Sequence, residues 1–373
     1  MNQPDPSNKT DRLTYVKVPK KISKMTDQEI DDWANQVFEH LMSGQSGNFF
    51  DYAKSKAEKV NMGMPVYSSD PEFFSSWSLG ADHPTQGRRY SNVKIQFAEM
   101  AKSNNLEVVE IAPRTATHAE LLRVHSARFV IQVTEKHIRF HSSDEDGAPA
   151  VLASAMVGAT LQMLEILLAG KTLTAINFAG AKHHAQYDFP FGFCVFNDMA
   201  VAATIATADH GLRVAIFDID AHHGDGTENL TLKNPDVLTY SVHQFGIFPG
   251  TGRVSDPANH AYNKALVAGD GDEKLAEASQ EFLSLVAEFK PDLVFIAAGA
   301  DGHVSDPLAG LAYTVEGYVE CARALREALP TMPMLIGGAG GYQPDDFTPE
   351  IWAKFALQIA LDAQASRTSS VGN

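Results

Sequence analysis

The chain has 373 residues, of which 44% are hydrophobic and 20% are charged. This globular composition excludes a chain that is disordered over most of its length, a collagen-like repeat and a coiled coil. Two cysteines, Cys194 and Cys321, are too few for a disulfide framework. The N-terminus has no hydrophobic signal core, and apolar runs such as VLTYSV and LVFIAA stop far short of the about 20 residues of a membrane helix. We therefore expect a soluble, cytoplasmic protein without a membrane partner.

Acidic residues outnumber basic ones, 46 to 30, which gives a formal net charge of −16. Residues 1–25 hold six basic and two acidic residues, so the rest of the chain carries −20. A body this acidic repels phosphate backbones, and we expect no nucleic-acid partner. The same charge could steer cationic substrates towards the protein, or it could serve only as a solvated surface that maintains solubility.

The N-terminal segment differs in character from the rest of the chain. Residues 1–24 are rich in Pro, Asn, Ser and Lys, which predicts a flexible arm. A capping box, Thr-Asp-Gln-Glu at 26–29, then predicts the start of a helix that Gly44 can end. Its apolar residues recur at helical spacing and are Ile30, Trp33, Ala34, Val37, Phe38 and Leu41. We expect a docking helix; the alternative is an interface in a homo-oligomer.

From about Met64 onwards, short β-rich apolar runs alternate with longer helical patterns. The predicted strands are 106–111, 174–178, 213–218, 237–242, 293–298 and 334–337. The predicted helices between them include 153–168, 198–208, 273–289 and 315–329. Without an internal repeat or a Ser/Gly-rich linker, this order predicts one α/β domain, a mainly parallel sheet with helices on both faces. Such sheets place ligand sites beyond the carboxyl ends of their strands, so the polar residues that follow each run are the candidates.

Two of these strand ends carry residues typical of a divalent-metal site. The run RVAIF leads into Asp218, Asp220 and His222, which can share one face because strand residues two apart point the same way. If the strand LVFIAAG is a neighbour, Asp301 can supply a further ligand. Two carboxylates and one histidine leave a coordination position open, as catalytic zinc sites do. The alternative is a capping aspartate with hydrogen-bonded histidines.

A pair of adjacent histidines follows the strand TAINFAG. His183 and His184 suit a mechanism in which one ring takes a proton from an activated water and its neighbour assists. Each ring needs its other nitrogen oriented, and carboxylates do this well. Asp218 and Asp225 are the candidate orienting groups. A histidine pair alone is weak evidence, but this pair lies ahead of GFCVFND and the metal strand.

A glycine-rich turn, GGAGGY at 337–342, follows the strand MLI. Its glycines allow the backbone to approach a site closely. Tyr342 then places a hydroxyl where a substrate carbonyl could be polarised, an oxyanion-stabilising role. A phosphate site is disfavoured, because the spacing is not G-x-G-x-x-G and no Gly-Lys-Ser/Thr follows. The alternative is a turn with a packed tyrosine.

Together these segments resemble the histone deacetylase superfamily. The resemblance rests on AGAKHHA, GFCVFNDMAVAA, IFDIDAHHGDGTE, SVHQ, FPGTG, AAGADGHVSDPLAGL and GGAGGY, with LLRVHSARFV similar to the family's N-terminal helix region. It covers about residues 64–345 and implies the arginase–deacetylase α/β fold. The superfamily includes acetylpolyamine amidohydrolases and acetoin-utilisation proteins. We therefore expect an arm and docking helix at residues 1–60 and a deacetylase-like catalytic domain at 61–373.

The resemblance implies a zinc-dependent amidohydrolase that removes an acyl group, acetyl first among them, from acetyl-lysine or a small acetylated amine. By motif, one Zn²⁺ per chain is held by Asp220, His222 and Asp301. The tandem bases are His183 and His184, partnered by Asp218 and Asp225, and Tyr342 polarises the amide carbonyl. The implied lining of the substrate tunnel is Gly192, Phe193, Phe248 and Leu308. The implied structural K⁺ site is Asp218, Asp220, His222, Ser241 and Val242.

The chain also departs from the family's motifs. AGAKHHA stands where many members have PPGHHA, and GGAGGY replaces four glycines and a tyrosine. Leu308 occupies a place where polyamine-selective relatives carry an acidic gatekeeper. The acidic residue at the substrate rim has three candidates, Asp144, Glu145 and Asp146, in a loop whose other interpretation is a solvated turn.

Two other functions remain open on the sequence alone. An arginase-like dinuclear ureohydrolase would need further carboxylates to bridge a second ion, and Gly224 and His303 stand where they are expected. A non-catalytic acyl-ligand-binding protein would keep the fold, but the complete set of ligands, bases and tyrosine argues against it.

Overall fold

The structure, a computed structural model, describes residues 63–70, 74, 76, 77, 83–135 and 148–371. The helix predicted at 26–44 and the acidic loop with Asp144, Glu145 and Asp146 lie outside these residues. The boundary predicted near residue 60 lies outside them as well.

One eight-stranded sheet forms the centre of the molecule, with strand order β2-β1-β3-β8-β7-β4-β5-β6. Every pairing in it is parallel. The strands are β1 (Val66–Ser68), β2 (Val109–Ile111), β3 (Thr174–Asn177), β4 (Val214–Asp218), β5 (Val237–Gln244), β6 (Ala261–Leu266), β7 (Leu293–Ala297) and β8 (Met334–Gly337). The predicted parallel sheet is confirmed, and all six predicted strands are present within a few residues.

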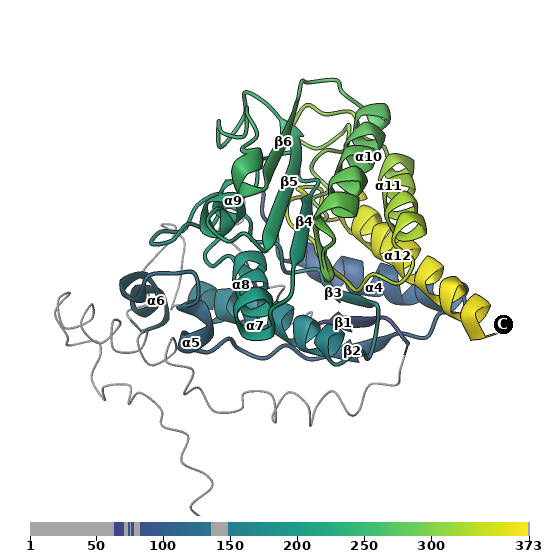
Figure 1. The fold of residues 1–373 in the computed structure, drawn as a ribbon, viewed down its shortest axis with the longest axis horizontal. Helices are drawn as coiled ribbons and strands as arrows, with labels where there is room; N and C mark the ends of the chain where they lie inside the picture. The colour runs from purple at the N-terminus through teal and green to yellow at the C-terminus, as the bar shows by residue number, and fades with distance from the viewer. Residues whose placement is uncertain (1–62, 71–73, 75, 78–82, 136–147, 372–373) are drawn as a thin grey trace, which may run out of the picture.

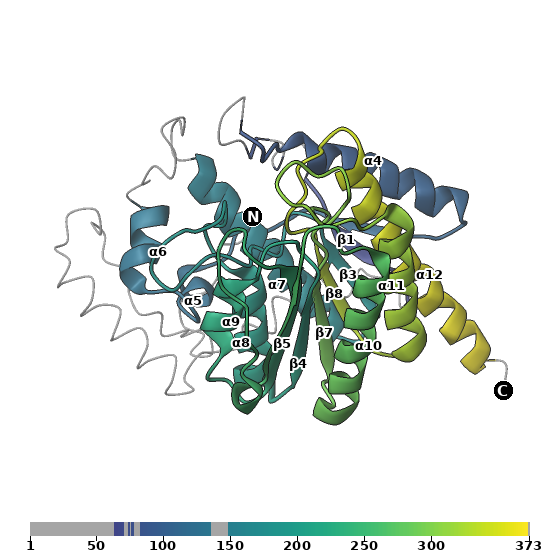
Figure 2. The same cartoon turned by 90° about the horizontal axis from the view of Figure 1, so that it is seen from above.

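Helices cover both faces of the sheet (Figures 1 and 2). One face carries α4 (Arg88–Ser103), α10 (Asp272–Phe289), α11 (Val315–Ala328) and α12 (Phe347–Val371). The other carries α7 (Ala148–Leu168), α8 (Asp198–His210) and α9 (Asp225–Thr231), with α5 (His118–Leu121) and α6 (Ala127–Thr134) beyond them. A short 3₁₀ turn, η2, spans Pro257–Asn259. Each central strand is therefore buried on both sides, which is why its sequence is almost continuously apolar.

The core helix α7 is apolar on nearly every side. A stretch of it, Ala150–Leu168, is long and apolar enough to cross a membrane, which the sequence analysis did not expect. In the protein, however, 83% of its apolar window is buried, and the helix packs on β1, β3, β8 and α8. Burial on all sides accounts for its composition, because a helix that is apolar all round is a core helix in a folded domain.

A buried arginine joins the sheet to the helices at the edge opposite the strands' carboxyl ends. Arg326 of α11 is fully buried and donates to the backbone oxygens of Met332 at 2.7 Å, Leu173 at 3.1 Å and Ile359 at 3.2 Å. These oxygens belong to the segments before β8 and β3 and to α12. One guanidinium therefore satisfies several carbonyl groups that are buried or partly buried.

Replacing this side chain tests its role. We expect Arg326→Met to lower the free energy of unfolding by about 3 kcal/mol, because buried carbonyl oxygens lose their donors. The control is Arg323→Met on the same helix, whose half-exposed side chain pairs with Glu320. We expect that variant to change stability by less than about 1 kcal/mol. Chemical denaturation of both variants gives the values, and equal losses would contradict the assignment.

Candidate metal centre and active site

The candidate residues gather at the carboxyl ends of four adjacent strands. In the order β3-β8-β7-β4, each strand is followed by one of the segments that the sequence analysis singled out. The loop after β3 carries the histidine pair, the loop after β8 carries Tyr342, and those after β7 and β4 carry the acidic residues. A parallel sheet thus brings together residues that are far apart in the chain.

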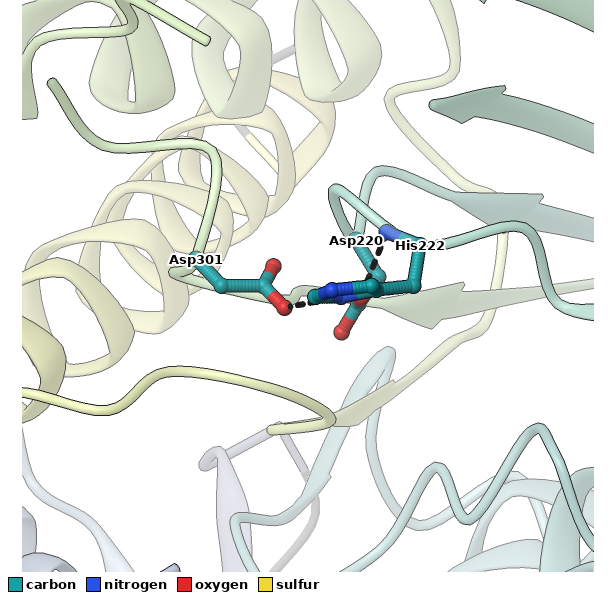
Figure 3. A group of neighbouring side chains, drawn as sticks. All are labelled: Asp220, His222 and Asp301. Carbon is teal, nitrogen blue, oxygen red and sulfur yellow. Dashed lines mark hydrogen bonds and ion pairs between the residues drawn. The ribbon is translucent and has the colours of Figure 1, made fainter. Parts of the chain in front are cut away.

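Asp220, His222 and Asp301 form a buried cluster (Figure 3). Nδ1 of His222 lies 2.8 Å from Oδ2 of Asp301 and 3.2 Å from Oδ1 of Asp220. One ligand atom from each residue lies within 4.8 Å of the others. Backbone groups hold both carboxylates, since Ala221 N–H donates to Asp301 Oδ1 at 2.8 Å and Gly340 N–H to Asp220 Oδ2 at 2.6 Å.

The pKa shifts of this cluster indicate that it attracts positive charge. Burial and the charge of Asp220 raise the pKa of Asp301 to about 7. Although burial disfavours a charged ring, hydrogen bonds to Asp220 and Asp301 raise the pKa of His222 to about 11. Two buried carboxylates and an imidazole match the donor set of a catalytic zinc site. In such a site, bonds of about 2.0–2.2 Å place neighbouring ligand atoms about 3.3 Å apart, close to the contacts seen here.

Each predicted base is hydrogen-bonded to its predicted carboxylate. Nδ1 of His183 lies 2.7 Å from Oδ2 of Asp218, and Nδ1 of His184 lies 2.7 Å from Oδ1 of Asp225. The two rings are buried, with centroids 4.0 Å apart. Both Nδ1–H groups therefore donate to carboxylates, which leaves each Nε2 available for proton transfer.

Their surroundings shift the pKa values of the two histidines in opposite directions. For His183 burial is outweighed by Asp218 and Asp220, which raise its pKa to about 9. For His184 burial and the neighbouring His183 lower the pKa to about 4. At neutral pH the pair thus holds one proton on His183 and leaves Nε2 of His184 free to accept another. Neighbouring groups with separated pKa values are a common arrangement for an acid and a base.

Tyr342 completes the bottom of the site. Its N–H donates to Oδ2 of Asp306 at 2.9 Å, and its ring lies 6.4 Å from that of His222 and 6.2 Å from that of Phe193. Burial and the charge of Asp301 raise its pKa, so the phenol stays protonated and can donate a hydrogen bond. A protonated phenol could stabilise an oxyanion, and that role of Tyr342 stays a prediction.

A cavity of about 560 Å³ leads to these side chains. The four predicted tunnel residues, Gly192, Phe193, Phe248 and Leu308, all line it, together with His184, His222 and Tyr342. Glycine is required at position 192, because φ there is +51° and a Cβ would lie 2.3 Å from the ring of His184. The lining residues that the sequence analysis missed are Trp77, His83, Pro190, Phe191, Cys194 and Val195. None of the lining residues in the described part of the chain is Asp, Glu, Lys or Arg.

The expected potassium site shares Asp220 and His222 with the metal cluster. Asp218 ends β4 and pairs in register with Ser241 of β5, which Val242 follows. Asp220 and His222 come directly after β4. The structure brings these residues together, and potassium itself stays a prediction.

Two supporting residues went unnoticed in the sequence. Asp306 accepts from the backbone of both Tyr342 and Leu308, at 2.9 Å each. Arg89 of α4 is buried and donates to the carbonyl oxygen of Gly341 at 2.8 Å. Asp306 lies within the quoted segment ADGHVSDPLAGL, so its motif was visible although its role was not.

Residues 83–359 match the sequence profile of the histone deacetylase domain. The chain belongs to the histone deacetylase family. It is 32% identical over 311 residues to the acetoin utilization protein AcuC of Bacillus subtilis, a match covering 77% of this chain and 80% of that protein. It is 30% identical over 296 residues to histone deacetylase 14, chloroplastic, of Arabidopsis thaliana, covering 71% and 69% of the two chains.

A solved structure of this family has the same fold. The crystal structure of the HDA15 HD domain superposes with a TM-score of 0.70 at 25% identity, covering 83% of this chain and 99% of that one. The expected arginase–deacetylase α/β fold is therefore confirmed. Membership of the deacetylase family supports hydrolysis of amides.

Two substitutions separate the roles within the site. We expect Tyr342→Phe to keep bound metal and stability but to lower kcat by about 10²–10³-fold, the usual cost of losing one oxyanion donor. Asp301→Ala should instead lose metal and stability, because Ala221 N–H and His222 lose their acceptor. Metal content and turnover of both variants provide the test. Metal loss in Tyr342→Phe with metal retained in Asp301→Ala would reverse the two roles.

Proposed function

We propose that the protein is a zinc-dependent deacetylase that hydrolyses an N-acyl amine, acetyl first among the acyl groups. The observation that carries this is the convergence of three groups at one apolar cavity: a metal-ligand triad that includes the lining residue His222, a histidine pair with one protonated and one neutral ring, and the phenol of Tyr342. The substrate class is an acylated primary amine such as acetyl-lysine or a small acetylated amine.

The side chains divide the chemistry between them. A zinc ion held by Asp220, His222 and Asp301 would polarise the amide carbonyl and make a water molecule more acidic when bound. His184, whose Nε2 carries no proton, accepts the proton of the attacking water. His183 holds a proton that the departing amine needs. Tyr342 donates its hydroxyl hydrogen to the amide oxygen as negative charge develops there.

The cavity favours a neutral acyl group on an aliphatic or apolar arm. Phe191 and Phe248 stand with ring centroids 4.8 Å apart, and Phe248 contacts the ring of His184 at 5.0 Å. Leu308 and Phe193, each more than a third exposed, lie at the edge of the same cavity. Such walls bury the methylene groups of a lysine-like arm, and each buried CH₂ contributes about 0.8 kcal/mol.

A dinuclear ureohydrolase fits the site poorly. A second metal would need an acid near Gly224, but a Cβ at that position would lie 2.3 Å from Oδ2 of Asp218. His303, the other position expected for such a ligand, has Nδ1 at 2.8 Å from Oγ of Ser305 and its ring stacked on Phe347. We therefore propose one zinc per chain. The proposed structural K⁺ site keeps the residues implied by the family resemblance, which are Asp218, Asp220, His222, Ser241 and Val242, and the proposed location is the cytoplasm.

Removal of metal tests the proposal. We expect dialysis against a strong chelator to abolish hydrolysis of an acetylated amine, and one equivalent of Zn²⁺ to restore it, because the triad supplies the metal's protein ligands. A panel of acetyl-lysine peptide, acetylputrescine and N-acetyl arylalkylamine in the same assay identifies the substrate class. Full activity of the metal-free protein, or urea release from a guanidino compound with two metals per chain, would contradict it.

A further inference from the structure

Asp218 and Asp225, the two carboxylates that orient the histidines, are held in different ways. Asp218 accepts from His183 with one oxygen, and its other oxygen accepts from the backbone N–H of Asp220 at 3.1 Å. Asp225 accepts from His184 with Oδ1, but its Oδ2 accepts from a side chain, Nε2 of Gln186, at 2.8 Å. The carboxylate that orients His184 is therefore held by a side chain, whereas the carboxylate that orients His183 is held by the backbone.

Gln186 contacts both members of the His184–Asp225 pair. Its Nε2 also donates to the backbone oxygen of His184 at 3.0 Å, so both amide hydrogens are used within the pair. The orientation of the amide is determined, because both of these partners are acceptors only and Nδ2 of Asn229 donates to Oε1 of Gln186 at 3.1 Å. Asn229 lies one turn after Asp225 on α9, so the side-chain amide of Gln186 contacts two successive turns of that helix.

The backbone of Gln186 is fixed as firmly as its side chain. Its N–H donates to the oxygen of Phe189 at 3.1 Å, and its carbonyl oxygen accepts from Nδ1–H of His125 at 2.9 Å. Burial lowers the pKa of His125 to about 4, and its Nε2 accepts from the N–H of Asn197, so that ring is a neutral donor to Gln186. Only 8% of Gln186 is exposed, which leaves water little access to the amide.

We propose that Gln186 is a positioning residue for the catalytic base. It holds the carboxylate of Asp225 so that His184 keeps Nε2 directed into the cavity. The inference rests on the proposed function for the part played by His184, but the contact of Gln186 with the His184–Asp225 pair does not depend on which acylated amine is the substrate.

Three variants of Gln186 separate positioning from packing. Gln186→Glu keeps the shape and the acceptor for Asn229 but faces Asp225 with an oxygen, and Gln186→Met keeps only an unbranched chain. We expect both to lower kcat by about 10- to 100-fold, the usual cost of losing a group that orients an active-site ligand, with KM changed less than about threefold. Gln186→Lys restores an N–H donor to Asp225, and we expect its kcat to recover to within about fivefold of the wild type. A residue that only fills space would not be rescued by lysine.

Asn229→Ala is the matched control. It removes a hydrogen bond from the same amide but leaves both contacts with the His184–Asp225 pair, so we expect kcat within about threefold of the wild type. Zinc content and thermal midpoint of every variant establish that the enzyme is folded and loaded. If one of Gln186→Glu and Gln186→Met fails to fold, the kcat of the other is compared with that of Gln186→Lys and the wild type.

Crystal structures of Gln186→Met and Asn229→Ala give a readout independent of activity. We expect the contact between His184 Nδ1 and Asp225 Oδ1 to lengthen or break in the first and to persist in the second. Wild-type kcat in folded Gln186→Met, or no gain from lysine over methionine, would overturn the proposal. If the wild-type enzyme hydrolyses no acylated amine, the proposed function fails, and these structures alone decide whether Gln186 positions the pair.

Discussion

Four buried carboxylates at one edge of the sheet form the constraint on which the site depends. Asp218, Asp220, Asp225 and Asp301 are each less than a tenth exposed. Their mutual repulsion in a region that excludes water has to be balanced by hydrogen-bond donors and positive charge. The surrounding structure supplies these as backbone N–H groups, imidazole rings and one buried amide.

The division of these partners gives each carboxylate a different task. Asp220 and Asp301 face the imidazole of His222 and have more acceptor capacity than one ring can satisfy, which is the condition under which a cation binds. Asp218 and Asp225 face one histidine each. Because His183 lies closer to the acidic cluster, it retains a proton, and that charge helps keep the adjacent His184 neutral. The charge of the metal cluster thus also determines which of the two histidines is protonated.

The elements predicted from sequence are those whose apolar pattern is set by burial. Central strands such as β4 and β7 are buried at every residue and read as short continuous apolar runs. β1 was missed because its three residues, Val-Tyr-Ser, belong to no longer apolar run, whereas the equally short β2 lies within the run LEVVEI. β6 was missed because it is an edge strand with polar, half-exposed positions. α4 was missed because no side chain caps its start and two of its buried residues are Arg89 and Tyr90.

The same reasoning explains which parts of the site were visible in the sequence. Ionisable residues at strand ends, such as Asp220 and His184, are recognisable because they make a poor core. Gln186 carries no charge and belongs to no motif with a known chemistry, so only its contacts indicate a role. The apolar lining residues Trp77 and Val195 were equally hidden, because apolar side chains at a cavity and in a core look alike in sequence.

The central claim is that the buried triad holds one catalytic zinc ion. Anomalous diffraction from crystals of the zinc-loaded protein, recorded above and below the zinc absorption edge, tests it most directly. The account predicts one strong peak within about 2.0–2.2 Å of Asp220, His222 and Asp301. Two metal peaks bridged by carboxylates, or a zinc peak only elsewhere on the protein, would contradict it.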